Sequence, residues 1–300
     1  MALNQFNLKL GKYAPYLLSI IILGVLLLIW SGMTGIPKFD PSGLSEDDLM
    51  MQEMNGDIIR DESGEYINNP DKLSAIPGPG RVYDKAVTEL SAPFEKMGTN
   101  DHGIGWLVVY TLKRFLVGFL LATVVAVFLG MLIGMSKTLL MALNPFIQVL
   151  KPVSPLAWMP LLLYSVKDPY ITSVLVVFMA SLWPTMANTA FGVSNIKKDY
   201  IRVSEMVEMS WFRRFYSVVL PASAPAIFAG LRISFGSALV AVVPAEMLLG
   251  ELGVGYLSWI EWNNLDIAGV IFAIIVVGVV GFLLDYGLSK LAQRFTYVEA

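Results

Sequence analysis

Long apolar runs recur along the chain and alternate with shorter polar segments. A helix needs about 20 mostly apolar residues to cross the hydrocarbon core of a bilayer. Six stretches approach or exceed that length, namely residues 13–37, 115–135, 138–166, 169–196, 216–245 and 267–284. The pattern therefore predicts an all-α polytopic membrane protein with six transmembrane helices.

The third stretch differs from the others because Lys151 and four prolines interrupt it. Proline removes a backbone donor and bends a helix. We therefore expect residues 138–166 to form a bent or broken span. The first stretch follows Lys9 and Lys12 and has the alternative of being a signal peptide, although its apolar core is longer than the roughly 7–15 residues usual for one.

Composition supports a membrane protein and excludes several other classes. The 300 residues are 56% hydrophobic and 15% charged, whereas soluble chains are about 25% charged. A net charge of −3 gives no global basic field for nucleic acid. The chain has no cysteine and one histidine, His102, which excludes disulfides and paired-histidine zinc sites, and we expect no metal site.

Basic residues indicate the orientation, because cytoplasmic loops are enriched in Lys and Arg. With six spans, three basic groups fall on the cytoplasmic side: Lys9 and Lys12; Lys197, Lys198, Arg202, Arg213 and Arg214; Lys290 and Arg294. Lys113 and Arg114 disagree with this arrangement. We expect both termini to lie in the cytoplasm.

The segment between Thr34 and Ile104 is polar, with 14 acidic and 6 basic residues. In the predicted topology it lies outside the cytoplasm, and we expect a partly ordered acidic lobe. The predicted organisation is an N-terminal segment with the first span at 1–37, an external lobe at 38–105 and a core transmembrane domain at 106–300, with a cytoplasmic loop at 194–220.

That loop carries apolar residues at helical spacing, followed by Pro221, which can open a new helix. The apolar set is Ile201, Val203, Met206, Val207, Met209 and Trp211. Physical chemistry leaves two interpretations open. The helix is either an anchor at the membrane interface or a ridge that docks on a cytoplasmic partner.

The sequence around Pro221 resembles the signature of binding-protein-dependent ABC importer permeases. Val218-x-Leu220-Pro221 is followed by Gly230-Leu231-Arg232 and Ala245-Glu246. The family motif is Glu-Ala-Ala, three residues, Gly, nine residues, then Ile-x-Leu-Pro. Its second half matches, whereas Arg202, Val203 and Ser204 occupy the Glu-Ala-Ala positions and Glu208 occupies the Gly position.

The resemblance implies a type I ABC importer permease of the bacterial inner membrane, whose short loop helix fits a cleft in an ATPase. The implied coupling residues are Arg202, Glu205, Met206, Glu208, Met209, Ser210 and Trp211. It also implies a homodimer with two cytoplasmic ATPases and an external substrate-binding protein. ATP and Mg²⁺ would be bound by the ATPases, leaving this chain with no catalytic residues and no cofactor.

Further sequence matches narrow the resemblance to one branch of this family. Gly98-x-Asn100-Asp101 and the run from Lys151 to Pro160 are similar to nitrate-type permeases. That branch includes nitrate/nitrite, bicarbonate and cyanate importers and is close to sulfonate and taurine permeases. Nitrate, with nitrite, is our first expectation. A secondary transporter or channel without an ATPase would be expected to show inverted repeats or a midplane ionisable cluster, and neither is visible.

Four residues within the spans are candidates for the substrate path. Arg232 and Lys151 offer positive charge to an anion, and Thr185 and Asn188 offer neutral donors. Each also has a structural interpretation. Arg232 can tether helices, Lys151 can mark the boundary of two half-spans, and polar side chains often hold helices together.

Overall fold

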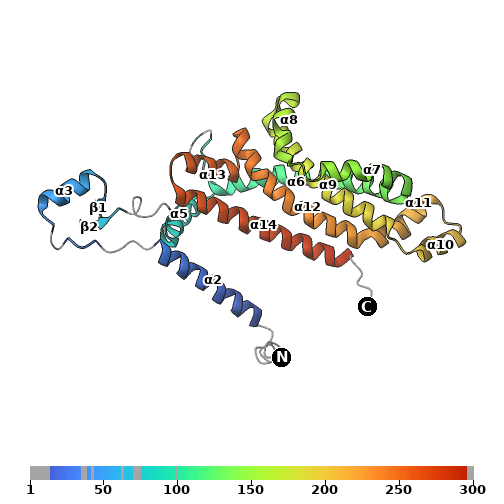
Figure 1. Cartoon of the computed structure of the whole chain (residues 1–300), viewed down its shortest axis with the longest axis horizontal. Coiled ribbons are helices and arrows are strands. Elements are labelled where there is room, and N and C mark those ends of the chain that lie inside the picture. The colour runs from blue at the N-terminus through green and yellow to red at the C-terminus, as the bar shows by residue number, and fades with distance from the viewer. Residues whose placement is uncertain are drawn as a thin grey trace. The chain divides into compact units, whose positions relative to one another are not determined.

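The computed structural model describes residues 14–34, 39–41, 44–61, 64–69, 76–96, 98 and 100–295, and it is mostly helical (Figure 1). Lys9 and Lys12, used for the predicted orientation, lie outside the described residues, as does the side chain of Arg294. Contacts divide the chain into two compact units. One contains the described part of residues 1–88 together with Asp266–Phe272, and the other contains the remainder.

The first unit combines one long apolar helix with a small polar fold. Its elements are α2 (Ala14–Met33), α3 (Glu46–Met54), β1 (Ile58–Arg60), β2 (Tyr66–Asn68) and most of α5 (Pro79–Ser91). The strands pair antiparallel, with Ile59 opposite Ile67. A capping box begins α3, in which Ser45 accepts a hydrogen bond from the Asp48 amide and the Asp48 carboxylate accepts one from the Ser45 amide.

The second unit is a helical bundle. Its elements are α6 (Ile104–Met135), α7 (Lys137–Leu150), η1 (Pro155–Trp158), α8 (Met159–Val166), α9 (Pro169–Ser194), α10 (Lys198–Met206), α11 (Trp211–Arg214), η2 (Phe215–Val219), α12 (Leu220–Leu249), α13 (Val254–Asn263) and α14 (Ile267–Phe295) from Ala273 onward. Phe115 and Phe119 of α6 interlock with Phe235 of α12 in its core, with the Phe115 and Phe235 ring centroids 4.9 Å apart.

Five helices of the described chain are long and apolar enough to span a membrane: Ala14–Met33, Ile104–Met135, Pro169–Ser194, Trp211–Leu249 and Ile267–Gln293. The bent span predicted between them is confirmed as a helix pair, Lys137–Leu150 and Pro155–Val166, that turns by 86°. Pro152 lies in the break and Pro155 begins η1 directly after it, and neither can donate a helical hydrogen bond.

The glycines of α6 show that it runs parallel to α9. Gly118 lies against Val177, and Gly134, farther along, lies against Val193. A Cβ at Gly118 would lie 2.7 Å from the Val174 carbonyl oxygen, so this close approach requires glycine. Two consecutive long helices that point the same way require the chain to cross back between them. The α7–α8 pair therefore makes one crossing, and the helix count is six with α2.

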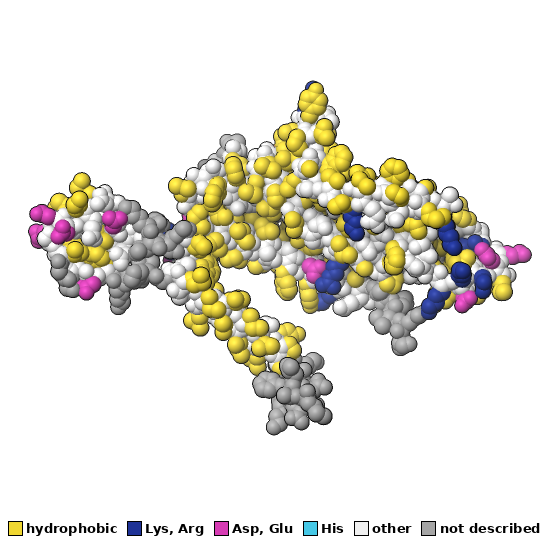
Figure 2. All heavy atoms as spheres, viewed as in Figure 1, with side chains coloured by type: hydrophobic (Ala, Val, Ile, Leu, Met, Phe, Trp, Pro, Cys, Tyr) yellow, Lys and Arg dark blue, Asp and Glu magenta, His cyan; other side chains and the backbone are white. Residues whose placement is uncertain are grey.

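The remaining long helices alternate in direction. Gly192 of α9 lies against Ala226 of α12, and Gly230, later in α12, lies against Asn188, earlier in α9. The two helices are therefore antiparallel. The end of α6, the 194–210 loop and the end of α14 thus share one end of the bundle. Figure 2 shows Lys and Arg side chains gathered there, over α10 and α11.

One boundary differs from expectation. A single helix runs from Trp211 to Leu249, so Pro221 does not open it. Pro221 has no amide to donate to Ser217, and the helix widens before it into the π-turn η2, where the Leu220 amide donates to the Phe215 carbonyl. A π-turn of this kind lets a helix continue past a residue that breaks the regular bonding.

Candidate functional site

The loop between α9 and α12 exposes a row of large apolar side chains. We call Val203, Met206, Val207, Trp211 and Phe212 the loop ridge. Met206 is 82% exposed and Phe212 is 71% exposed. Exposed apolar patches on a rim of charges mark interaction sites, and here Arg202, Glu205 and Glu208 supply exposed charges on the same loop.

The apolar residues predicted at helical spacing on this loop do not all lie on one face. Ile201 turns inward and packs with Phe215 against the core of the bundle, whereas Val203, Met206 and Val207 are exposed. The neighbouring Ser204 is buried and donates a hydrogen bond to the Ile201 carbonyl. The helix therefore has an inner anchor and a separate outer apolar surface.

Short contacts connect α10 to the long helix that follows. Arg214 pairs with Glu205, with Nη1 and Oε1 3.4 Å apart. Trp211 stacks on Phe215 with ring centroids 5.6 Å apart. Between the two helices the chain turns at Glu208, whose φ of 48° is left-handed. The loop ridge is thus joined directly to α12.

All seven predicted coupling residues lie on this loop. Arg202, Glu205, Met206, Glu208, Ser210 and Trp211 are exposed, and Met209 is half-buried. The described structure brings them together around the loop ridge.

The four predicted path residues are not brought together. Thr185 is buried and donates to the Ser234 hydroxyl at 2.7 Å, and Asn188 donates to the Pro184 carbonyl, so both lie in the packing between α9 and α12. Arg232 pairs with Asp285 of α14 at 3.1 Å. Lys151 lies elsewhere, in a groove beside η1.

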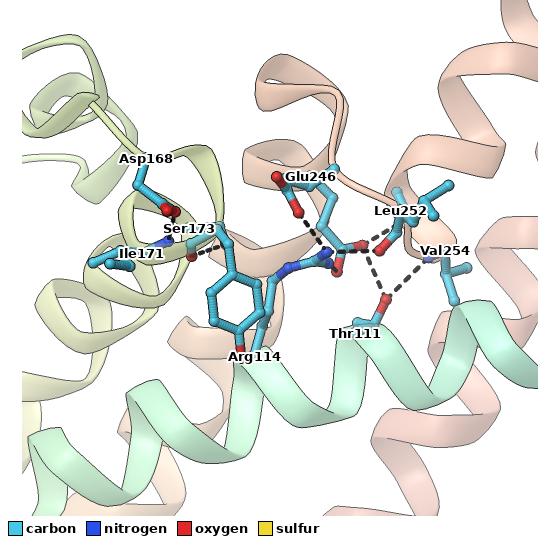
Figure 3. A network of polar contacts seen from close by, with 11 residues as sticks. Thr111, Arg114, Asp168, Ile171, Ser173, Glu246, Leu252 and Val254 are labelled. Carbon is cyan, nitrogen blue, oxygen red and sulfur yellow. Dashed lines mark hydrogen bonds and ion pairs between the residues drawn. The ribbon is translucent and has the colours of Figure 1, made fainter. Parts of the chain in front are cut away.

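A buried ionic network joins α6 to the end of α12 (Figure 3). Arg114 is 3% exposed and Glu246 is fully buried, and their side chains meet at 2.6 Å. Arg114 also binds Glu251 at 3.0 Å and the Leu252 carbonyl at 2.8 Å. The Thr111 hydroxyl donates to Glu246 at 2.9 Å.

Backbone amides complete this network. Val254 N–H donates to the Thr111 hydroxyl, and Gly255 N–H donates to Glu246, both at 3.0 Å. A Cβ at Gly253 would collide with the Glu246 carboxylate, so only glycine permits this approach. The pairing was not predicted from the sequence, although Arg114 is one of the two basic residues that disagree with the predicted orientation.

Comparison with known proteins identifies the family. Residues 122–297 match the family described as "Binding-protein-dependent transport system inner membrane component". The chain belongs to this family. It is a multi-pass inner-membrane permease component, and the resemblance found around Pro221 is confirmed.

Relatives of this permease place it in the nitrate and bicarbonate branch. It is 41% identical over 72% of its length to the nitrate import permease of Leptolyngbya laminosa and 39% identical over 71% to that of Synechocystis, covering 77% of each. It is 35% identical over 74% of its length to the bicarbonate transport system permease of Synechocystis, covering 80% of that chain.

A solved structure shows the same fold at low identity. An inward-facing MetNI methionine ABC transporter chain matches with a TM-score of 0.56 and 12% identity, covering 64% of this permease and 97% of that chain. The predicted permease architecture is therefore confirmed. The relatives named here are transport permeases rather than enzymes.

Proposed function

We propose that this chain is the permease subunit of an ATP-driven importer for nitrate, with nitrite as a second substrate. Two nitrate permeases, at 39% and 41% identity, match this chain better than the bicarbonate permease of Synechocystis does at 35%, and this difference supports the choice. Bicarbonate is the second candidate, followed by cyanate and sulfonates or taurine. Family membership decides against a secondary transporter or channel.

We infer that the complete transporter has two copies of this chain, two cytoplasmic ATPases and an external substrate-binding protein. The ATPases bind ATP and Mg²⁺ and perform the hydrolysis, so this chain contributes no catalytic residue and no cofactor. The basic end of the bundle faces the cytoplasm, in agreement with the positive-inside rule, and the acidic lobe faces outward. Both termini then lie in the cytoplasm.

The mechanism we propose is alternating access driven through the loop ridge. The ridge fits an apolar groove on the ATPase, and the charged residues around it fix the register. Because α11, η2 and α12 form one helix, displacement of the ridge moves the spanning part of α12 directly. The path then opens outward to receive the anion from the binding protein.

Two experiments test this proposal, namely purification of the transporter in mild detergent and an uptake assay with the reconstituted complex. The tagged chain is extracted from its native membrane in mild detergent, and the co-purifying subunits are weighed and counted. We expect two ATPase copies for two permease chains. Reconstituted with its binding protein, the complex is expected to take up labelled nitrate with ATP, with unlabelled bicarbonate competing weakly. A lone oligomer without ATPase would contradict the mechanism, and preferential bicarbonate uptake would contradict the substrate.

A further inference from the structure

A groove with a volume of about 360 Å³ lies beside the break between α7 and η1. Lys151 and Ser154 line it from the break, Trp183 lines it from α9, and Ser237 lines it from α12. The rest of its wall is apolar. The groove therefore combines one cation and three neutral hydrogen-bond donors in an apolar setting.

The groove lies near the middle of the spanning helices. At about 1.5 Å per residue, Trp183 is roughly 15 Å or more from either end of α9 (Pro169–Ser194). Ser237 is likewise at least roughly 18 Å from each end of α12 (Leu220–Leu249). The hydrocarbon core of a bilayer is about 30 Å thick, so these positions belong to its central part.

Lys151 is the cation of this region without a carboxylate partner in the described structure. Arg114 is paired with Glu246 and Glu251, and Arg232 is paired with Asp285. No ion pair, side-chain hydrogen bond or ring contact of the Lys151 ammonium is formed with any described residue. An uncompensated charge at this depth is costly, and such residues mark ion pathways.

The neutral donors of the groove are only partly engaged. Ser237 donates to the Ile233 carbonyl, whereas the Ser154 hydroxyl caps no helix and the Trp183 indole N–H has no acceptor among the described residues. Donors without acceptors in an apolar wall complement an anion with several oxygen acceptors.

We propose that this groove is a binding subsite for a monovalent oxyanion on the transport path. Lys151 supplies the charge, Ser154 and Trp183 supply neutral donors, and Ser237 lines the wall from α12. The inference rests on the proposed function and makes it specific. One cation neutralises one charge, so the subsite favours monovalent anions over divalent ones. A single cation among neutral donors also binds weakly enough to release its cargo, as conduction requires.

Charge removal in the intact transporter is the first test. Lys151→Gln is compared with Lys151→Arg and with Lys167→Gln. Lys167 is a matched control, because it ends α8 just as Lys151 ends α7 and is also exposed. We expect Lys151→Gln to lower ATP-driven anion uptake at least about tenfold, the usual weight of a charged hydrogen bond. Lys151→Arg, which keeps the charge, is expected to retain more uptake than Lys151→Gln, and Lys167→Gln is expected to stay within twofold of the parent.

The absence of cysteine from the chain permits a chemical test of the same charge. Lys151→Cys is expected to lose uptake, and aminoethyl methanethiosulfonate, which attaches an ammonium through a disulfide, is expected to restore it. Methyl methanethiosulfonate, which attaches a neutral group, is expected not to. Equal rescue by both reagents would show that volume rather than charge matters and would overturn the proposal.

A binding measurement separates this inference from the proposed function. The labelling rate of Ser237→Cys in the purified complex is followed with nitrate, bicarbonate and sulfate. We expect a monovalent oxyanion to slow labelling, and Lys151→Gln to abolish that protection. If the parent imports an anion other than nitrate, the proposed substrate fails while Lys151-dependent protection upholds the subsite. Protection that is absent, or that persists in Lys151→Gln, overturns the subsite whatever the transporter carries.

Discussion

At the scale of the residue, Glu208 occupies a backbone conformation that suits glycine. Its φ of 48° is left-handed, and this conformation costs a non-glycine residue about 1–2 kcal/mol. The resemblance to the permease motif places glycine at this position, so the structure supplies the physical reason for that motif.

We predict that Glu208→Gly raises the free energy of unfolding by about 1 kcal/mol, seen as a rise of roughly 2–4 °C in the melting temperature in detergent. Glu208→Ala is the control, because it removes the same carboxylate but keeps a Cβ. If the alanine variant gains as much as the glycine variant, the carboxylate and not the backbone is the source of the effect.

The Arg114–Glu246 pair provides a second prediction at this scale. Removing one member of a buried pair leaves an uncompensated charge and costs about 3–5 kcal/mol. Both Glu246 and Glu251 pair with Arg114, so Arg114→Gln is expected to lower thermal stability strongly, whereas Glu53→Gln, which breaks the exposed pair with Arg60, is expected to cost less than about 1 kcal/mol.

A compensating variant completes this comparison. Replacing Arg114 and Glu246 together by methionine removes both charges and keeps an apolar volume, which restores much of the lost stability where an ion pair is buried. A double variant as unstable as the sum of the two single variants would show that the two residues act independently.

At the scale of the element, the sequence predicted the spanning helices well and the segments that connect them poorly. The prolines of residues 138–166 made the bend visible in advance, because a proline's missing donor is a local property. The continuation of α12 through Pro221 was missed, since a π-turn absorbs that proline and depends on the packing of Phe215. The inward turn of Ile201 was missed because it depends on a tertiary contact.

The loop ridge offers the prediction that belongs to this scale. Glu205→Arg is expected to reduce ATP-driven uptake severalfold while ATP hydrolysis and membrane insertion persist. Because Glu205 also pairs with Arg214, the charge-swapped variant Glu205→Arg with Arg214→Glu separates two causes. Docking on an ATPase predicts that the swap stays impaired, whereas a purely internal role predicts full recovery. Glu46→Arg, on the polar part of the first unit, is the matched control.

At the scale of the whole molecule, the orientation is open to direct measurement. Alkaline phosphatase inserted after Asp61 is expected to be active, since the acidic segment lies outside the cytoplasm in the proposed topology. The same enzyme fused to the C-terminus is expected to be inactive. Activity at the C-terminus, or its absence after Asp61, would contradict the topology.

The sequence predicted less of the candidate sites than of the fold. The predicted coupling residues lie together because they are contiguous in the chain. The four predicted path residues do not, because Thr185 and Asn188 lie in a helix contact and Arg232 in an ion pair. Helix packing decides which polar groups form hydrogen bonds and ion pairs with one another. Lys151 therefore stands out as an unpaired cation only when the ion-pair partners of Arg114 and Arg232 are known.

The single helix from Trp211 to Leu249 carries the loop ridge at one end, Ser237 of the groove near its middle and Glu246 of the ionic network near its far end. This helix is therefore about 58 Å long, and a tilt of about 10° about one end moves the other end by roughly 10 Å. Under the proposed mechanism this one helix connects all three places. Loosening the network at Glu246 would then weaken the transmission of movement from the ATPase, and a tighter ATPase contact would change how long the anion stays at Lys151.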